Sequence, residues 1–152
     1  MTDLNFEDIV GRYFNLNLKK DNYRIYVEEA GQGTPLLCLH TAGSDGRQFR
    51  HILNDKRITN NYRVIVFDLP WHGKSNPPEG YELNDYKLTT ELYKEIIMSF
   101  CKQYKLIDPV IMGCSMGGRV VLHLALEHGN FFKAVIALEG ADKLEPYYDL
   151  DW

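Results

Sequence analysis

A serine between two glycines is the residue of this chain best placed for nucleophilic chemistry. Residues 113–117 read Gly-Cys-Ser-Met-Gly, which matches Gly-x-Ser-x-Gly, a turn that holds a serine between a strand and a helix. The turn is so tight that side chains at either glycine would collide with each other or with neighbouring backbone. An apolar run, residues 110–112, comes before it, and an apolar helical segment follows. The pattern predicts Ser115 as a nucleophile; the alternative is that Ser115 only caps a helix behind the turn.

A second segment with a chemical use is the loop of residues 40–43, which reads His-Thr-Ala-Gly after the apolar run 36–39. Backbone N–H groups of such a loop can stabilise a developing oxyanion. The other donor expected there is the N–H of Met116, directly after the serine. Small residues also mark ordinary strand-to-helix turns, so the loop indicates an oxyanion hole only in combination with the serine motif.

The third segment, residues 67–75, holds an aspartate and a histidine four residues apart. Asp68 and His72 are the residue types that would complete a catalytic triad with Ser115. We expect a structural role instead, in which Asp68 and Ser75 bond local backbone groups and hold a turn. Catalysis by His72 stays open as the alternative.

A base for Ser115 is hard to find further along the chain. His123 and His128 follow it by eight and thirteen residues on the same expected helix. The helical rise puts their backbones roughly 12 and 20 Å from Ser115, whereas a base must come within about 3 Å of its partner. Both histidines are therefore expected to be ordinary helix residues. Glu139, at the end of the last expected strand, stays open as a catalytic acid.

The periodicity of the chain predicts the strands that position these residues. Apolar and polar residues alternate over 14–18 and 23–27, which indicates an antiparallel hairpin. Continuous apolar runs are typical of strands covered on both faces, and they occupy residues 36–39, 64–67, 110–112 and 134–138.

Three segments between these strands have helical spacing, and they occupy residues 47–53, 88–102 and 118–128. Asn84 or Asp85 is the expected cap of the second helix. The order of elements predicts the α/β class, a doubly wound sheet with a leading antiparallel hairpin.

Together the three motifs resemble the α/β-hydrolase superfamily, over about residues 13–142 and in the order found in that family. The resemblance implies an α/β-hydrolase-like sheet, mostly parallel with the antiparallel hairpin in front, that stops after about six strands. It implies Ser115 as the nucleophile, with the N–H groups of Ala42 and Met116 as the oxyanion hole. A serine at this position, rather than an aspartate, disfavours dehalogenase and epoxide-hydrolase chemistry.

The chain departs from the usual pattern of the family at two places. It has Thr41 after His40 where the family usually has glycine, and it has Trp71 at another usual glycine, which places an indole near the site entrance. We expect His40, Thr41 and Trp71 to contact the substrate.

In this family the acid and the histidine follow the serine, on loops after two further strands. The resemblance therefore implies that residues 1–152 are the amino-terminal part of the domain, with a lid beginning at about 143–152. We expect a piece of a larger hydrolase, inactive alone, or one of two pieces that assemble. The expected partners are a small acyl substrate and the missing carboxy-terminal half or a second copy.

The functional hypothesis is a serine hydrolase of the carboxylesterase type that cleaves a small ester or related acyl compound through an acyl-enzyme. C–C bond hydrolase and perhydrolase activities stay open, because they use similar parts on the same fold. A ligand-binding protein without turnover and an inactive fragment that associates through its sheet edge are the alternatives from other classes.

Composition argues against several other classes of protein. The 152 residues hold 17 basic and 21 acidic side chains, and a net charge of -4 gives no reason to expect nucleic acid as a partner. Apolar stretches such as residues 120–126 are too short to cross a membrane, and the acidic amino terminus lacks the pattern of a signal peptide. Cys38, Cys101 and Cys114 have no metal-ligand spacing and suit a reducing cytosol. We expect a cytoplasmic protein without metal or cofactor.

Overall fold

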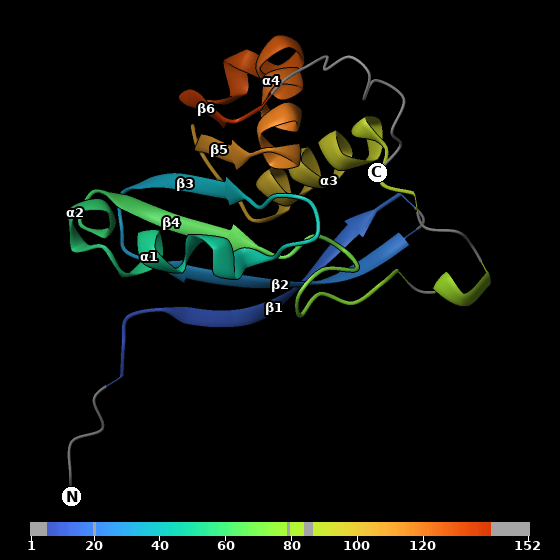
Figure 1. Cartoon of the computed structure of the whole chain (residues 1–152), viewed down its shortest axis with the longest axis horizontal. Coiled ribbons are helices and arrows are strands. Elements are labelled where there is room, and N and C mark those ends of the chain that lie inside the picture. The colour runs from blue at the N-terminus through green and yellow to red at the C-terminus, as the bar shows by residue number, and fades with distance from the viewer. Residues whose placement is uncertain (1–5, 20, 79, 84–86, 141–152) are drawn as a thin grey trace, which may run out of the picture.

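A six-stranded sheet in the order β1-β2-β4-β3-β5-β6 forms the centre of the molecule (Figure 1). The structure is a computed structural model, and it describes residues 6–19, 21–78, 80–83 and 87–140. The strands are β1 (Val10–Leu18), β2 (Asp21–Ala30), β3 (Thr34–Leu39), β4 (Tyr62–Phe67), β5 (Val110–Cys114) and β6 (Ala134–Leu138).

The first two strands form an antiparallel hairpin at one edge of the sheet, and β2 also pairs antiparallel with β4. The hairpin register places Leu16 opposite Tyr23. Leu16 is buried whereas Asn17 beside it is exposed, because successive side chains of a strand point to opposite faces. The pairs β3–β4, β3–β5 and β5–β6 are parallel. The prediction of a mostly parallel sheet with a leading antiparallel pair is therefore confirmed.

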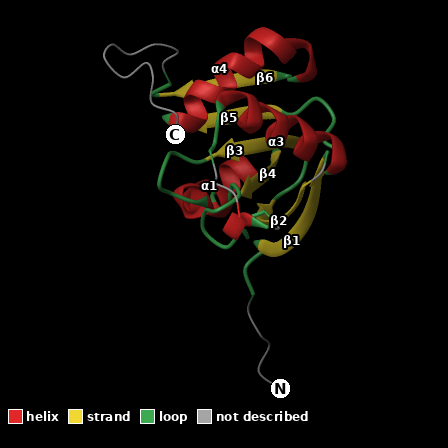
Figure 2. Cartoon of the chain, turned by 90° about the vertical axis from the view of Figure 1, so that its right-hand side faces the viewer, coloured by secondary structure: helices red, strands yellow, loops and turns green. Residues whose placement is uncertain are grey.

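Helices cover both faces of the sheet (Figure 2). One face carries α3 (Thr90–Gln103) and α4 (Met116–His128). The other face carries η1 (Gly46–Phe49), α1 (Arg50–Asn54) and α2 (Lys56–Thr59). Two short 3-10 turns complete the set, η2 (Tyr81–Leu83) and η3 (Gly129–Phe131). In the part of the chain that the structure describes, no helix has the length and apolar character needed to cross a bilayer.

The residues of β3 show why a continuous apolar run is needed in this sheet. Leu37 and Leu39 are buried in the cluster beneath α3 and α4. Leu36 and Cys38 are buried in the other cluster, beneath η1 and α1. Both faces of the strand are thus removed from water, so an alternating pattern would place polar groups in one of the two clusters.

Three predictions about elements need correction. Residues 47–53 form two short helices, η1 and α1, and α2 follows although no helix was expected there. Thr89 caps α3 by accepting a hydrogen bond from the Leu92 N–H at 3.2 Å, while Asn84 and Asp85 lie outside the described residues. Strand β6 was expected to be covered on both faces, yet Ile136 and Leu138 are 40% and 43% exposed. It lies at the edge of the described sheet, where it pairs with β5.

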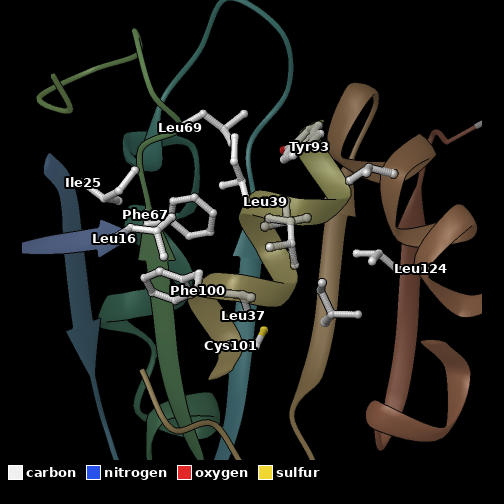
Figure 3. Close-up of a cluster of buried hydrophobic side chains, with 14 of the residues drawn as sticks. Leu16, Ile25, Leu37, Leu39, Phe67, Leu69, Tyr93, Phe100, Cys101 and Leu124 are labelled. Atoms are coloured by element: carbon white, nitrogen blue, oxygen red, sulfur yellow. The ribbon is translucent and has the colours of Figure 1, made fainter. Parts of the chain in front are cut away.

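Phe100 of α3 lies at the centre of the larger cluster (Figure 3). Its ring stacks on Phe67 with the ring centroids 4.6 Å apart, and on Tyr104 at 4.9 Å. Phe14 meets the same ring edge-on at 5.7 Å. One fully buried side chain therefore joins α3, the hairpin and β4.

We expect Phe100→Ala to lower the free energy of unfolding by about 3–5 kcal/mol, because it removes buried contacts and leaves a cavity. Urea denaturation followed by circular dichroism measures the change. Leu126→Ala is the matched control: Leu126 is 83% exposed, so its loss should cost less than about 0.5 kcal/mol. Equal losses in the two variants would contradict this description of the core.

Candidate active site

Ser115 is the single residue between β5 and α4, and its backbone is held in an unusual conformation. Its φ is 53° and its ψ is -111°, a region that costs a residue with a side chain on the order of 1–3 kcal/mol. Its N–H donates to the carbonyl of Leu138 at 2.8 Å, and its carbonyl accepts from the Arg119 N–H at 2.8 Å. The serine is exposed, and its side chain makes no capping hydrogen bond with α4. The alternative that Ser115 serves as a side-chain helix cap is therefore wrong.

The glycines around Ser115 allow backbone segments to pack against one another. A Cβ atom at Gly113 would overlap the carbonyl of Gly117. A Cβ atom at Gly117 would lie 2.5 Å from the carbonyl oxygen of Leu39, well inside van der Waals contact. The steric conflict expected from the sequence is thus present at both positions, and at Gly117 the obstacle is the end of β3.

The loop of residues 40–43 lies beside the serine turn because β3 and β5 are adjacent. Leu39 pairs with Gly113 in the parallel register, so both strands end at the same level. Thr41 uses its N–H to bond Oε1 of Gln48 at 2.9 Å. Ala42, the next residue, is exposed. The structure therefore brings Ser115, Met116 and the loop with Ala42 to one edge of the sheet.

His40 is fully buried and binds two loops together, rather than facing a substrate. Its Nε2 accepts from the Leu69 N–H at 3.1 Å. The ring is therefore the neutral tautomer with hydrogen on Nδ1, which donates to the Thr41 carbonyl at 2.8 Å. Burial lowers the pKa of His40. Because both ring nitrogens are occupied by backbone groups, the expectation that His40 contacts the substrate is not supported by its position.

Asp68 and Ser75 hold the turn after β4, as the sequence predicts. The buried Asp68 carboxylate accepts from the N–H groups of Gly46 at 2.7 Å and Lys74 at 2.8 Å. The Ser75 hydroxyl donates to the Asp68 carbonyl at 2.6 Å and accepts from the Tyr26 N–H at 2.9 Å. These bonds give the segment a structural role, in which the Asp68 carboxylate orients backbone rather than a histidine.

The three histidines considered as a base can be placed in the same way. Nδ1 of His72 lies 2.9 Å from the Pro70 carbonyl within the same turn, and its ring centroid is 5.0 Å from that of His40. His128 is the last residue of α4, and His123 lies five residues before it. Neither helix residue is therefore near the start of α4, where Ser115 lies. Glu139, the open candidate for an acid, is exposed directly after β6.

Trp71 lies in the loop after β4 at the same edge of the sheet, with a left-handed φ of 68°. Its indole is 41% exposed and meets Tyr81 edge-on, with the ring centroids 5.0 Å apart. A large aromatic residue with positive φ is uncommon. Strand β3 separates the strand before Trp71 from β5, and the expectation of an indole near the site entrance stays a prediction.

Two charged residues near the site were missed by the sequence analysis. Asp45 caps η1 by accepting from the Arg47 N–H, and the hydrogen bonds from the Arg47 side chain lower the pKa of Asp45 to about 2. An aspartate before Gly-Arg is the signal that could have found this cap. Arg119 lies in the first turn of α4, and the signal there was a charge inside an otherwise apolar segment.

Within the described ranges, no cluster of three or more histidine, cysteine or acidic residues could hold a metal ion.

Comparison with known proteins gives a consistent picture. A family model described as alpha/beta hydrolase fold matches residues 34–151. The magnesium-chelatase 30 kDa subunit of Rhodobacter capsulatus is 33% identical over 95 residues, which are 62% of this chain and 31% of that protein. The pimeloyl-[acyl-carrier protein] methyl ester esterase of Vibrio vulnificus is 25% identical over 119 residues, 78% of this chain and 42% of that protein.

Among solved structures, the epoxide hydrolase VrEH1 from Vigna radiata superposes with a TM-score of 0.70 at 21% identity. It covers 84% of this chain and 39% of that structure. This likeness shows the shared fold alone. The chain spans less than half the length of each of these three proteins.

We expect His40 to make the protein less stable as the pH falls below about 6.5. Burial lowers the folded-state pKa of His40 from its usual value of 6.5, so the unfolded chain binds a proton before the folded protein does. The free energy of unfolding therefore decreases from pH 6.5 downward until the folded-state pKa is reached. Urea midpoints at pH 7.5 and 5.5 measure this decrease.

The variant His40→Gln cannot take up that proton, so its midpoint should fall less between the two pH values than that of the wild type. His128→Gln, at an exposed site on α4, should keep the wild-type fall. A full wild-type fall in His40→Gln would show that other groups cause the pH dependence.

Proposed function

Because the chain belongs to the alpha/beta hydrolase fold family, we propose that it carries the nucleophile and the oxyanion hole of a serine hydrolase that cleaves small esters. The observation that carries the proposal is the conformation of Ser115. It is exposed on a strained turn, and the turn is packed against the loop that ends β3. Strain of this kind persists where the surrounding structure enforces it, and it clusters at functional sites.

In the proposed reaction, the Ser115 oxygen attacks the ester carbonyl carbon while a histidine outside the described residues takes the serine proton. The carbonyl oxygen becomes an oxyanion. Collapse of this intermediate breaks the bond to the alcohol, which leaves with the proton from the histidine. Water then attacks the acyl-enzyme by the same route and releases the acid and Ser115. The acid that orients the histidine also lies outside the described residues in this proposal.

Two backbone donors are proposed for the oxyanion. The N–H of Met116 is the first of α4, and the first N–H groups of a helix have no partner within it. The positive end of the helix dipole adds to its effect. Thr41 has already used its N–H, so Ala42 is the proposed second donor. Thr41 and Trp71 are the proposed contacts for the remainder of the substrate. His40 instead holds the loop through hydrogen bonds to backbone groups.

The choice of an ester rests on two supports. A serine nucleophile with an oxyanion hole matches acyl transfer, and one of the similar proteins is named a methyl ester esterase. C–C bond hydrolysis and perhydrolysis would use the same serine and donors.

The three cysteines are free, which supports the proposed cytoplasmic location.

The edge of β6 supports a further proposal about assembly. In the described sheet β6 is the last strand and pairs with β5, and an open strand edge favours pairing with another strand. We propose that the edge pairs with the part of the hydrolase that holds the acid and the histidine. A second copy of this chain is the competing partner.

We expect Ser115→Ala to abolish labelling of the full-length protein by a fluorophosphonate probe and to lower ester hydrolysis by about 10⁴-fold or more. In-gel fluorescence and a p-nitrophenyl ester assay measure the two effects. His72→Ala is the control; because the ring of His72 is assigned to the turn after β4, this variant should still be labelled. Labelling that persists in Ser115→Ala would rule out Ser115 as the nucleophile.

A further inference from the structure

Arg119 lies one helical turn after the proposed nucleophile, partly buried between α4 and α3. Its Nε atom is buried without a hydrogen-bond partner. The described residues form no ion pair with this guanidinium. A buried donor of this kind is rare in folded proteins and calls for a specific explanation.

The surroundings of Arg119 raise the free-energy cost of leaving its guanidinium without a partner. The residue lines a small hollow of about 20 Å³ together with Leu88, Thr89, Thr90, Tyr93, Met116 and Val120. These residues include the first turns of both α3 and α4. A helix N-terminus is the positive end of the helix dipole, so two positive ends meet a positive side chain here. The first turn of α4 has no acidic residue. Glu91 of α3 is 81% exposed and pairs with Lys94 instead.

The position of Arg119 links this hollow to the nucleophile. Its N–H bonds the Ser115 carbonyl at 2.8 Å, and side chains on a helix lean toward the N-terminal end. Met116 lines the same hollow and provides the proposed oxyanion donor. An anion that bonds the guanidinium in this hollow would therefore lie next to Met116, the residue that follows the nucleophile.

We propose that Arg119 binds a carboxylate of the substrate, so that the enzyme prefers esters whose acyl chain ends in a free acid. The proposal rests on the hydrolase function and names its substrate class. A guanidinium bonds a planar carboxylate through two parallel N–H groups. The volume of the hollow admits about one water-sized group, which suits a carboxylate oxygen better than a phosphate with three oxygens. An acidic side chain of the same protein is the competing source of the carboxylate.

The experiment compares two p-nitrophenyl esters of equal chain length in the full-length protein: the glutarate monoester, which carries a carboxylate, and the neutral valerate ester. We expect Arg119→Gln to lower kcat/KM for the glutarate ester by about 10- to 100-fold, mainly through KM, because a hydrogen-bonded charge pair is lost. The valerate ester should lose far less. Arg119→Lys keeps the positive charge but lacks the two parallel N–H groups, so it should retain part of the preference for the glutarate ester.

Arg12→Gln is the matched control. It removes the same charge from β1, which three strands separate from β5 in the sheet, and should leave the ratio of the two esters unchanged. An equal loss for both esters in Arg119→Gln would overturn the proposal. A lower melting temperature with an unchanged ratio would also overturn it, and would identify an internal carboxylate as the partner.

A second readout separates this inference from the hydrolase function itself. Glutarate should raise the melting temperature of Ser115→Ala, and the rise should vanish when Arg119→Gln is added. If neither ester is cleaved but this shift is present, the carboxylate site stands and the esterase function fails. If the esters are cleaved with the same ratio in Arg119→Gln and wild type, the inference fails while the esterase function stands.

Discussion

The close approach of backbone to backbone at Gly113 and Gly117 is the constraint on which the site depends. With any larger residue at Gly117, α4 would be pushed away from the Leu39 carbonyl, and with it the Met116 N–H would move away from the loop after β3. The same contact forces Ser115 to make the whole turn between β5 and α4, which explains its positive φ. The exposed serine and the proposed donors next to it are thus consequences of one packing requirement.

That requirement is met only because the loops around the turn are fixed independently. The buried His40 ring joins the loop after β3 to the loop after β4. The Asp68 carboxylate joins the start of η1 to the turn that follows β4. Neither group needs to touch a substrate to matter for the proposed reaction, since Ala42, one of the two proposed oxyanion donors, lies in the loop that His40 holds. Polar residues of this kind act by positioning.

Much of the fold could be predicted from the sequence, because its signals are local. The alternation in β1 and β2, the apolar runs and the serine motif each describe a few consecutive residues. Two of the predictions that failed depended on contacts between residues far apart in the sequence. The burial of both nitrogens of His40 depends on Leu69, which no spacing reveals. The exposure of Ile136 depends on whether another element covers the face of β6 opposite to Val135 and Ala137, which pack against the larger cluster. The cap by Thr89 was missed because several residues before α3 were able to fill that role.

Arg119 is a residue whose sequence pattern indicates nothing unusual, whereas the charges around it in the structure do. In the sequence it is one charge in an apolar helical segment, which a long side chain at a helix surface explains well enough. In the structure it lies between two helix N-termini with a buried donor unsatisfied. An uncharged residue of similar length would fill the same space without the repulsion between the guanidinium and the two helix N-termini. We therefore connect the charge of Arg119 with the proposed binding of a substrate carboxylate.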